Sequence, residues 1–129
     1  MAKQINNRNI QQKQVMNSEL IISKNELNEK LKERILLGNE LFVRVVNDSE
    51  DFMKLQSDFS NWNDYNSEYL KQSFNIPANE YKIDYDNAGK FIGLYDFDDS
   101  FQKHLHNLKS RIESKKDNLN HCCPIKKDC

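Results

Sequence analysis

The stretch that decides the fold is 59-FSNWNDYNSEYLKQSF-74, where five large aromatic side chains are separated almost entirely by Asn, Asp and Ser. On a helix with 100° between successive residues, one arc of about 140° collects most of the apolar side chains: Phe52, Leu55, Phe59, Trp62, Tyr69, Leu70 and Phe74. Ser60, Asn61 and Asp64 point away from that arc. The pattern therefore predicts a helix over residues 49–74 with one buried apolar side and one solvated amide side.

Two polar residues, Asn66 and Ser73, fall inside the apolar arc of this predicted helix. A buried Asn requires hydrogen-bond partners. Asn66 either sets the register of helix pairing, as single polar residues do in coiled coils, or lies at the edge of the core and binds water. Both interpretations stay open at this point. We expect a hydrogen bond from Asn66 to a neighbouring helix or loop.

Start signals for further helices lie on both sides of this stretch. Ser23 and Glu26 form a capping box, with Ile22 and Leu27 placed as a hydrophobic staple, before a predicted helix over residues 24–45. A short helix is predicted near residues 78–88. The last predicted helix, 99–119, has a narrow apolar seam made of Phe101, Leu105, Leu108, Ile112 and Leu119. The expected fold class is all-α, a small bundle of about three main helices plus the short one.

The composition fits one small domain with few turns. The chain has 129 residues, 37% hydrophobic and 30% charged, with three Gly and two Pro. We expect a polar N-terminal arm over residues 1–22, a helical domain over 23–119 and a flexible Cys-containing tail over 120–129. No apolar run approaches the roughly 20 residues of a transmembrane helix, and the polar N-terminus does not resemble a secretory signal. The expected location is cytoplasmic, without membrane contact.

Charge is unevenly distributed along the chain. Residues 1–34 carry +3, residues 47–99 carry -8 and residues 100–129 carry +4, within a net charge of -1. The basic C-terminal helix could contact phosphate, but it has no aromatic side chains interleaved for stacking bases. We therefore interpret the basic side chains Lys103, Lys109, Arg111, Lys115 and Lys116 as a solvated helix face, and nucleic-acid binding as the less favoured alternative.

No metal or cofactor site is predicted. Asp84, Asp86 and Gly89 resemble the start of a calcium loop, but Ala88 and Tyr95 occupy two positions that need oxygen ligands. The C-terminal group does not match the usual zinc-ligand spacing, and an odd number of cysteines does not suit a disulfide framework: His121, Cys122, Cys123 and Cys129. No catalytic motif is present, and His104 and His106 have no nucleophile near them in sequence. We expect no enzymatic activity, no cofactor and no small-molecule substrate.

Four segments together resemble a known family. They are 31-LKERILLGNEL-41, 47-NDSEDF-52 and 59-FSNWNDYN-66, followed by 70-LKQSF-74. This arrangement is similar to the helical leader that precedes a TIR-like nucleotide-binding domain in some bacterial antiphage-defence effectors. The similarity covers about residues 27–90 and is most specific from Trp62 to Asn66. No segment of this sequence resembles the TIR-like domain, so we expect the nucleotide chemistry of those effectors to be absent.

The resemblance implies an interaction or assembly module that acts through helix-mediated protein–protein contacts, with a protein partner or by self-association. The alternative is a stand-alone regulatory or nucleic-acid-binding protein that uses the basic C-terminal helix. The residues expected to form the core and contact motif come from the two amphipathic helices: Phe59, Trp62, Asn66, Tyr69, Leu70, Leu105, Leu108 and Ile112.

Overall fold

Helices make up the described part of the chain. The structure is a computed structural model that describes residues 18–90 and 100–121. Its helices are α2 (Lys24–Phe42), α3 (Ser49–Ser73), α4 (Glu80–Asn87) and α6 (Phe101–His121). In the described ranges the only extended pairing is an isolated bridge between Leu20 and Phe74. The predicted all-α class is confirmed.

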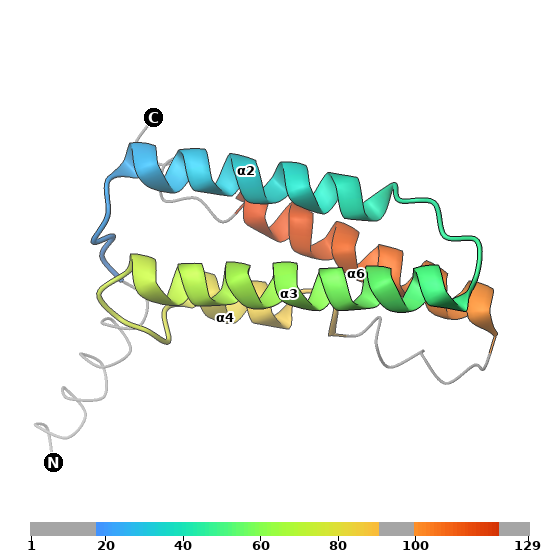
Figure 1. Ribbon diagram of the computed structural model, residues 1–129. Coiled ribbons are helices and arrows are strands. Elements are labelled where there is room, and N and C mark those ends of the chain that lie inside the picture. The colour runs from blue at the N-terminus through green and yellow to red at the C-terminus, as the bar shows by residue number, and fades with distance from the viewer. Residues whose placement is uncertain (1–17, 91–99, 122–129) are drawn as a thin grey trace, which may run out of the picture.

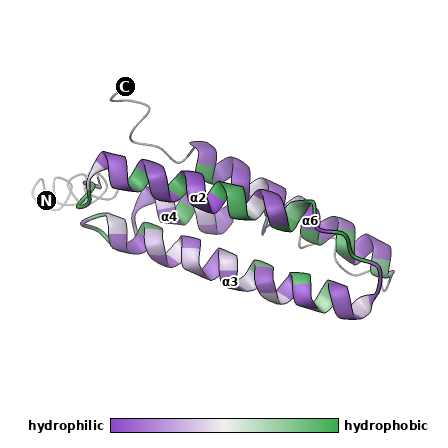
Figure 2. Cartoon of the chain, turned by 45° about the horizontal axis from the view of Figure 1, so that its top comes forward, coloured by the Kyte–Doolittle hydropathy of each residue, from purple (hydrophilic) through white to green (hydrophobic). Residues whose placement is uncertain are grey.

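The helices pack as a bundle in which neighbours along the chain run in opposite directions (Figure 1). The α2 helix runs one way, α3 returns beside it, α4 turns back, and α6 runs parallel to α3. The α2 helix packs against both α3 and α6, while the short α4 packs against α3 and α6. Green hydrophobic positions lie mainly on facing sides of the helices, and purple positions cover the outside (Figure 2).

Local capping explains where the helices begin. The Ser23 hydroxyl accepts a hydrogen bond from the Glu26 amide at 3.0 Å, as the capping box predicts. The Asp48 carboxylate accepts one from the Asp51 amide at 2.8 Å and caps α3. The Asn79 amide oxygen accepts one from the Lys82 amide at 2.9 Å and caps α4. Each helix start therefore satisfies an otherwise unpaired backbone donor.

The end predicted for the first helix is wrong. The helix continues through Gly38, as expected, but it ends at Phe42 rather than at residue 45. The Val43 amide still donates to the Asn39 carbonyl and the Arg44 amide to the Leu41 carbonyl, and the chain then leaves the helical conformation. Val43, Val45 and Val46 are β-branched and have low helix propensity, which favours an extended connection to α3. The other predicted helices differ from the observed ones by one or two residues at most ends.

The core is one continuous cluster drawn from all four helices. Its fully or almost fully buried apolar members are Leu27, Leu31, Leu41, Leu55, Phe59, Trp62, Leu70, Phe74, Tyr85, Leu105, Leu108, Ile112 and Leu119. Gly38 lies where three helices approach closely. A Cβ atom at Gly38 would come within 2.6 Å of Trp62 Cζ2 and 2.7 Å of Lys116 Cγ. The absent side chain therefore sets the distance between α2, α3 and α6.

The described domain begins before residue 23. The Ile21 amide bonds to the Ser73 carbonyl, and the Asn75 amide bonds to the Glu19 carbonyl, both at 2.9 Å. Residues 18–22 thus pair with the end of α3, and His121 still belongs to α6. The predictions for residues 1–17 and 122–129, and for the start of the last helix at residue 99, concern parts outside the described ranges. Over residues 18–90 and 100–121, the helices lack the length and apolar character needed to cross a membrane.

Candidate functional site

A buried polar network joins three helices at Asn66. This residue on α3 is only 1% exposed. Its amide oxygen accepts a hydrogen bond from Arg34 Nε of α2 at 2.6 Å, and its amide nitrogen donates to the Tyr85 hydroxyl of α4 at 2.9 Å. The expected hydrogen bond to a neighbouring helix is confirmed, with two helices instead of one. Asn66 therefore fixes the register of α2 and α4 on α3.

Arg34 and Trp62 reinforce this network through a reciprocal contact. Trp62 Nε1 donates to the Arg34 carbonyl at 2.8 Å, and Arg34 Nη2 donates to the Trp62 carbonyl at 3.3 Å. The Arg34 guanidinium also lies over the Tyr65 ring, 4.1 Å from its centroid. Burial lowers the pKa of Arg34 and raises the pKa of Tyr85, because both charged forms lose solvation. This cluster has the character of a structural clamp.

Most of the residues predicted to form the core and contact motif pack against other residues of this chain, inside the bundle. Seven of them are buried in the bundle: Phe59, Trp62, Asn66, Leu70, Leu105, Leu108 and Ile112. Tyr69 is partly buried at the edge of the core and stacks with Tyr65. A partner that binds the folded domain therefore has to contact other side chains.

The basic face predicted for the last helix is only partly solvated. Lys115 and Lys116 are each 7% exposed, so the prediction of solvent exposure for these two is wrong. Lys116 donates to the Asn39 side chain, pairs with Glu113 at 3.0 Å and lies over the Phe42 ring. Lys115 donates to the Tyr85 carbonyl at 2.6 Å and to the Asp86 carbonyl at 3.3 Å. Both lysines therefore fasten α6 to other helices.

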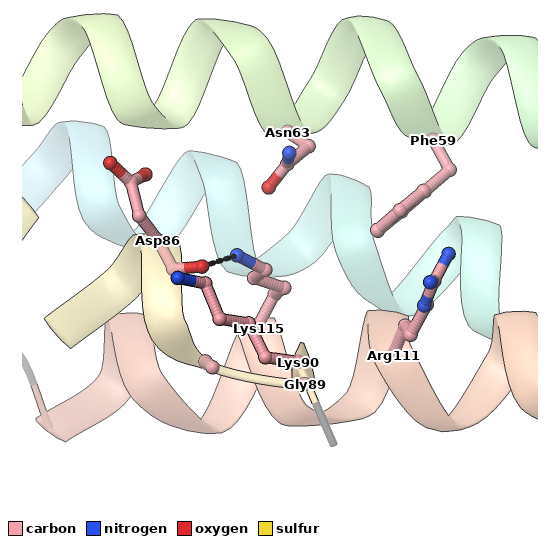
Figure 3. A pocket seen from close by; sticks show the side chains of 8 residues that line it. Phe59, Asn63, Asp86, Gly89, Lys90, Arg111 and Lys115 are labelled. Atoms are coloured by element: carbon pink, nitrogen blue, oxygen red, sulfur yellow. Dashed lines mark hydrogen bonds between the residues drawn. The ribbon is translucent and has the colours of Figure 1, made fainter. Parts of the chain in front are cut away.

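A cationic pocket lies where α4 ends against α3 and α6 (Figure 3). Its volume is about 180 Å³, and its lining consists of Phe59, Asn63, Asp86, Ala88, Gly89, Lys90, Arg111 and Lys115. Gly89 has a φ of +81°, a conformation that favours glycine, and it turns the chain from α4 to Lys90. This pocket could not be predicted from the sequence, because its residues come from three separate regions of the chain.

A second hollow runs between α2 and α3 on the side away from α4. We call it the α2/α3 groove; it has a volume of about 290 Å³ and is lined by Arg34, Leu37, Glu40, Leu41, Arg44, Asp58, Asn61, Trp62 and Tyr65. Arg44 pairs with Asp58 across the groove at 2.7 Å, which lowers the pKa of Asp58. Leu37 and Tyr65 are 37% and 44% exposed there. The groove thus combines an apolar floor with a charged rim.

Metal binding finds no support in the described ranges. Residues 18–90 and 100–121 contain no group of three or more His, Cys, Asp or Glu side chains placed to hold a metal ion. Asp84 and Asp86 lie on the α4 helix and not in a calcium loop. The Asp86 carboxylate accepts hydrogen bonds from Lys82 at 2.6 Å and Ser67 at 2.7 Å. Burial would raise the pKa of Asp86, but these two donors outweigh that effect and lower it.

Comparison with known proteins adds no relative. No family model, curated protein or solved structure matches this chain.

Proposed function

We propose that this domain is a non-enzymatic interaction module that binds a helix of another protein in the α2/α3 groove. The supporting observation is where apolar side chains are exposed. Eight large apolar side chains are exposed in the described ranges, and four of them lie within residues 36–45: Leu36, Leu37, Val43 and Val45. Hydrophobic positions also mark the connection that leaves α2 (Figure 2). Of these four, Leu37 lines the α2/α3 groove together with the exposed Tyr65, and exposed apolar side chains that line a groove are typical of a protein-binding surface.

The shape of the groove favours a helix as the occupant. Two packed helices leave a furrow along their contact line, and an amphipathic helix can lay its apolar side into such a furrow. Leu37 and Tyr65 would contact that apolar side, while Glu40 at the rim remains available to a basic side chain. In the described ranges Glu40 forms no ion pair. The resemblance of residues 27–90 gives the class of partner, a TIR-like antiphage-defence effector.

Replacing Leu37 by Glu tests this proposal. A buried unpaired carboxylate in an apolar contact should weaken association by at least about tenfold, which corresponds to about 1.4 kcal/mol. The bundle should keep its stability because Leu37 is already part exposed. Association is measured by co-purification with a TIR-like antiphage-defence effector, and by sedimentation of the purified protein at several concentrations.

Met53→Glu is the matched control, since Met53 is exposed on α3 outside the groove. It should bind like the wild type. Equal losses for Leu37→Glu and Met53→Glu would argue against the groove. A protein that stays monomeric at all concentrations and retains no effector would overturn the proposed function. Self-association lost only in Leu37→Glu would keep the groove and replace the effector by a second copy.

We disfavour nucleic-acid binding as the function of this domain. It needs a run of accessible basic side chains on α6, and two of them, Lys115 and Lys116, are buried in hydrogen bonds to other helices. The basic side chains of α6 that remain exposed are too few to contact the successive phosphates of a nucleic acid, and such contacts produce the salt-dependent binding of these proteins.

A further inference from the structure

We propose that the cationic pocket binds a phosphate or diphosphate group of a small solute, held by Lys90, Arg111 and Lys115. This site is independent of the α2/α3 groove, which lies between other faces of the helices. Three positive side chains line one small cavity, and in the described ranges none of them forms an ion pair. Like charges gathered without a counter-ion cost free energy, and an anion removes that cost.

Among the described lining residues, the single acid Asp86 neutralises these cations only in part. The Asp86 carboxylate is occupied by Lys82 and Ser67, both within 2.7 Å. Figure 3 shows Lys115 bonded instead to the main-chain oxygen of Asp86. Main-chain oxygens at the end of α4 carry only partial negative charge. A positive charge on Lys115 is thus held in place by main-chain oxygens and is only partly compensated by the Asp86 carboxylate.

The pKa of Lys115 lies below the ordinary value for a lysine. Burial, opposed by the attraction of Asp86 and helped by the repulsion of Lys90 and Arg111, lowers its pKa to about 8. The α3 helix contributes only Phe59 and Asn63 to the lining and brings no charge. An anion in the pocket would raise this pKa, because it favours the protonated form of Lys115.

Asn63 supplies a further polar group at the pocket. Its amide oxygen is buried and has no hydrogen-bond partner in the described structure. In Figure 3 the Asn63 side chain extends from α3 toward the space above Lys115. Rotation of the amide by 180° presents its NH₂ group to an oxyanion, and the two orientations are nearly equivalent in shape. The pocket thus offers three charged donors and one neutral donor.

The size of the pocket selects the class of ligand. A water molecule needs about 10–15 Å³ of cavity volume of this kind, so about 180 Å³ leaves room for a phosphate or diphosphate. A nucleic-acid backbone would need an open basic surface, which the burial of Lys115 denies. Phosphate oxygens accept hydrogen bonds from both Lys and Arg, and Arg can bind two of them at once.

The test uses pyrophosphate as the probe, in calorimetric titrations at constant ionic strength with chloride as the background anion. Arg111→Gln and Lys90→Gln should each weaken pyrophosphate binding by at least about tenfold, since each removes a charge-assisted hydrogen bond to the anion. Lys109→Gln is the matched control: it removes the same charge from α6 at a position outside the pocket. It should bind pyrophosphate like the wild type.

A second readout follows Lys115 directly. Pyrophosphate should raise the pKa of Lys115 above 8, measured by NMR titration of its side chain with and without the probe. Equal weakening by Arg111→Gln and Lys109→Gln would mean general charge screening and overturn the proposal. An unmoved Lys115 pKa, or no saturable binding of pyrophosphate, would overturn it as well. Tighter binding of a phosphoserine peptide than of pyrophosphate would replace the small solute by a phosphoprotein.

Discussion

Replacing Asn66 by Leu is expected to destabilise the bundle by about 3 kcal/mol, although Leu is apolar and similar in size. The substitution removes the acceptor of Arg34 Nε and the donor to the Tyr85 hydroxyl. Both groups are buried, and neither can turn to water. A lost hydrogen bond to a charged group costs about 1.5–3 kcal/mol, and an unsatisfied neutral group adds about 1 kcal/mol or more. Urea denaturation measures the change, with an unchanged slope expected.

Asn61→Leu is the control on the same helix, because Asn61 is exposed. It should change stability by less than about 0.5 kcal/mol. Removing the charge as well should recover part of the loss: Arg34→Met combined with Asn66→Leu should cost less than the sum of the single changes by about 1 kcal/mol or more. Equal costs for Asn66→Leu and Asn61→Leu would contradict the clamp role of Asn66.

Gly38→Ala is expected to destabilise the protein by about 2 kcal/mol, which reverses the usual effect of this change inside a helix. Ala ordinarily favours a helix over Gly by about 1 kcal/mol. Here the new methyl group would lie 2.6 Å from Trp62 Cζ2 and 2.7 Å from Lys116 Cγ. The indole cannot move freely, since its Nε1 donates to the Arg34 carbonyl at 2.8 Å. The helices must separate, and overpacking of this kind costs about 1–3 kcal/mol.

The Lys116→Ala background provides the control for this clash. It removes one of the two colliding side chains, so the cost of Gly38→Ala should fall by about 1 kcal/mol there. Thermal unfolding of the four variants measures this coupling. A stabilising effect of Gly38→Ala in the wild-type background would show that the three helices are not held at this distance.

The sequence was sufficient to predict the amphipathic helices. It also predicted that Asn66 lies on the apolar side of its helix and forms a hydrogen bond there. The apolar residues of these helices repeat with the period of a helix, and this period survives in the packed bundle because each helix buries one side. The partners of Asn66 could not be predicted. Arg34 and Tyr85 lie 32 and 19 residues away along the chain, and helical spacing does not say how helices are placed around one another.

The spacing of apolar residues indicated that Lys115 and Lys116 are buried, but their positive charge led us to predict solvent exposure. The seam of the last helix steps by seven residues from Ile112 to Leu119, and the skipped position falls at residues 115–116. The aliphatic stems of these two lysines fill that position, and their ammonium groups donate hydrogen bonds to α2 and α4. The α2/α3 groove and the cationic pocket could not be predicted, because each combines side chains from separate helices.

Amide hydrogen exchange in the presence and absence of the co-purified partner tests the central claim, that the α2/α3 groove makes the functional contact. The partner should slow exchange in residues 36–45 and around Tyr65. Exchange over residues 105–112 should stay unchanged, because Leu105, Leu108 and Ile112 are already buried within the chain. Protection that appears over 105–112 while residues 36–45 exchange as before would contradict the account.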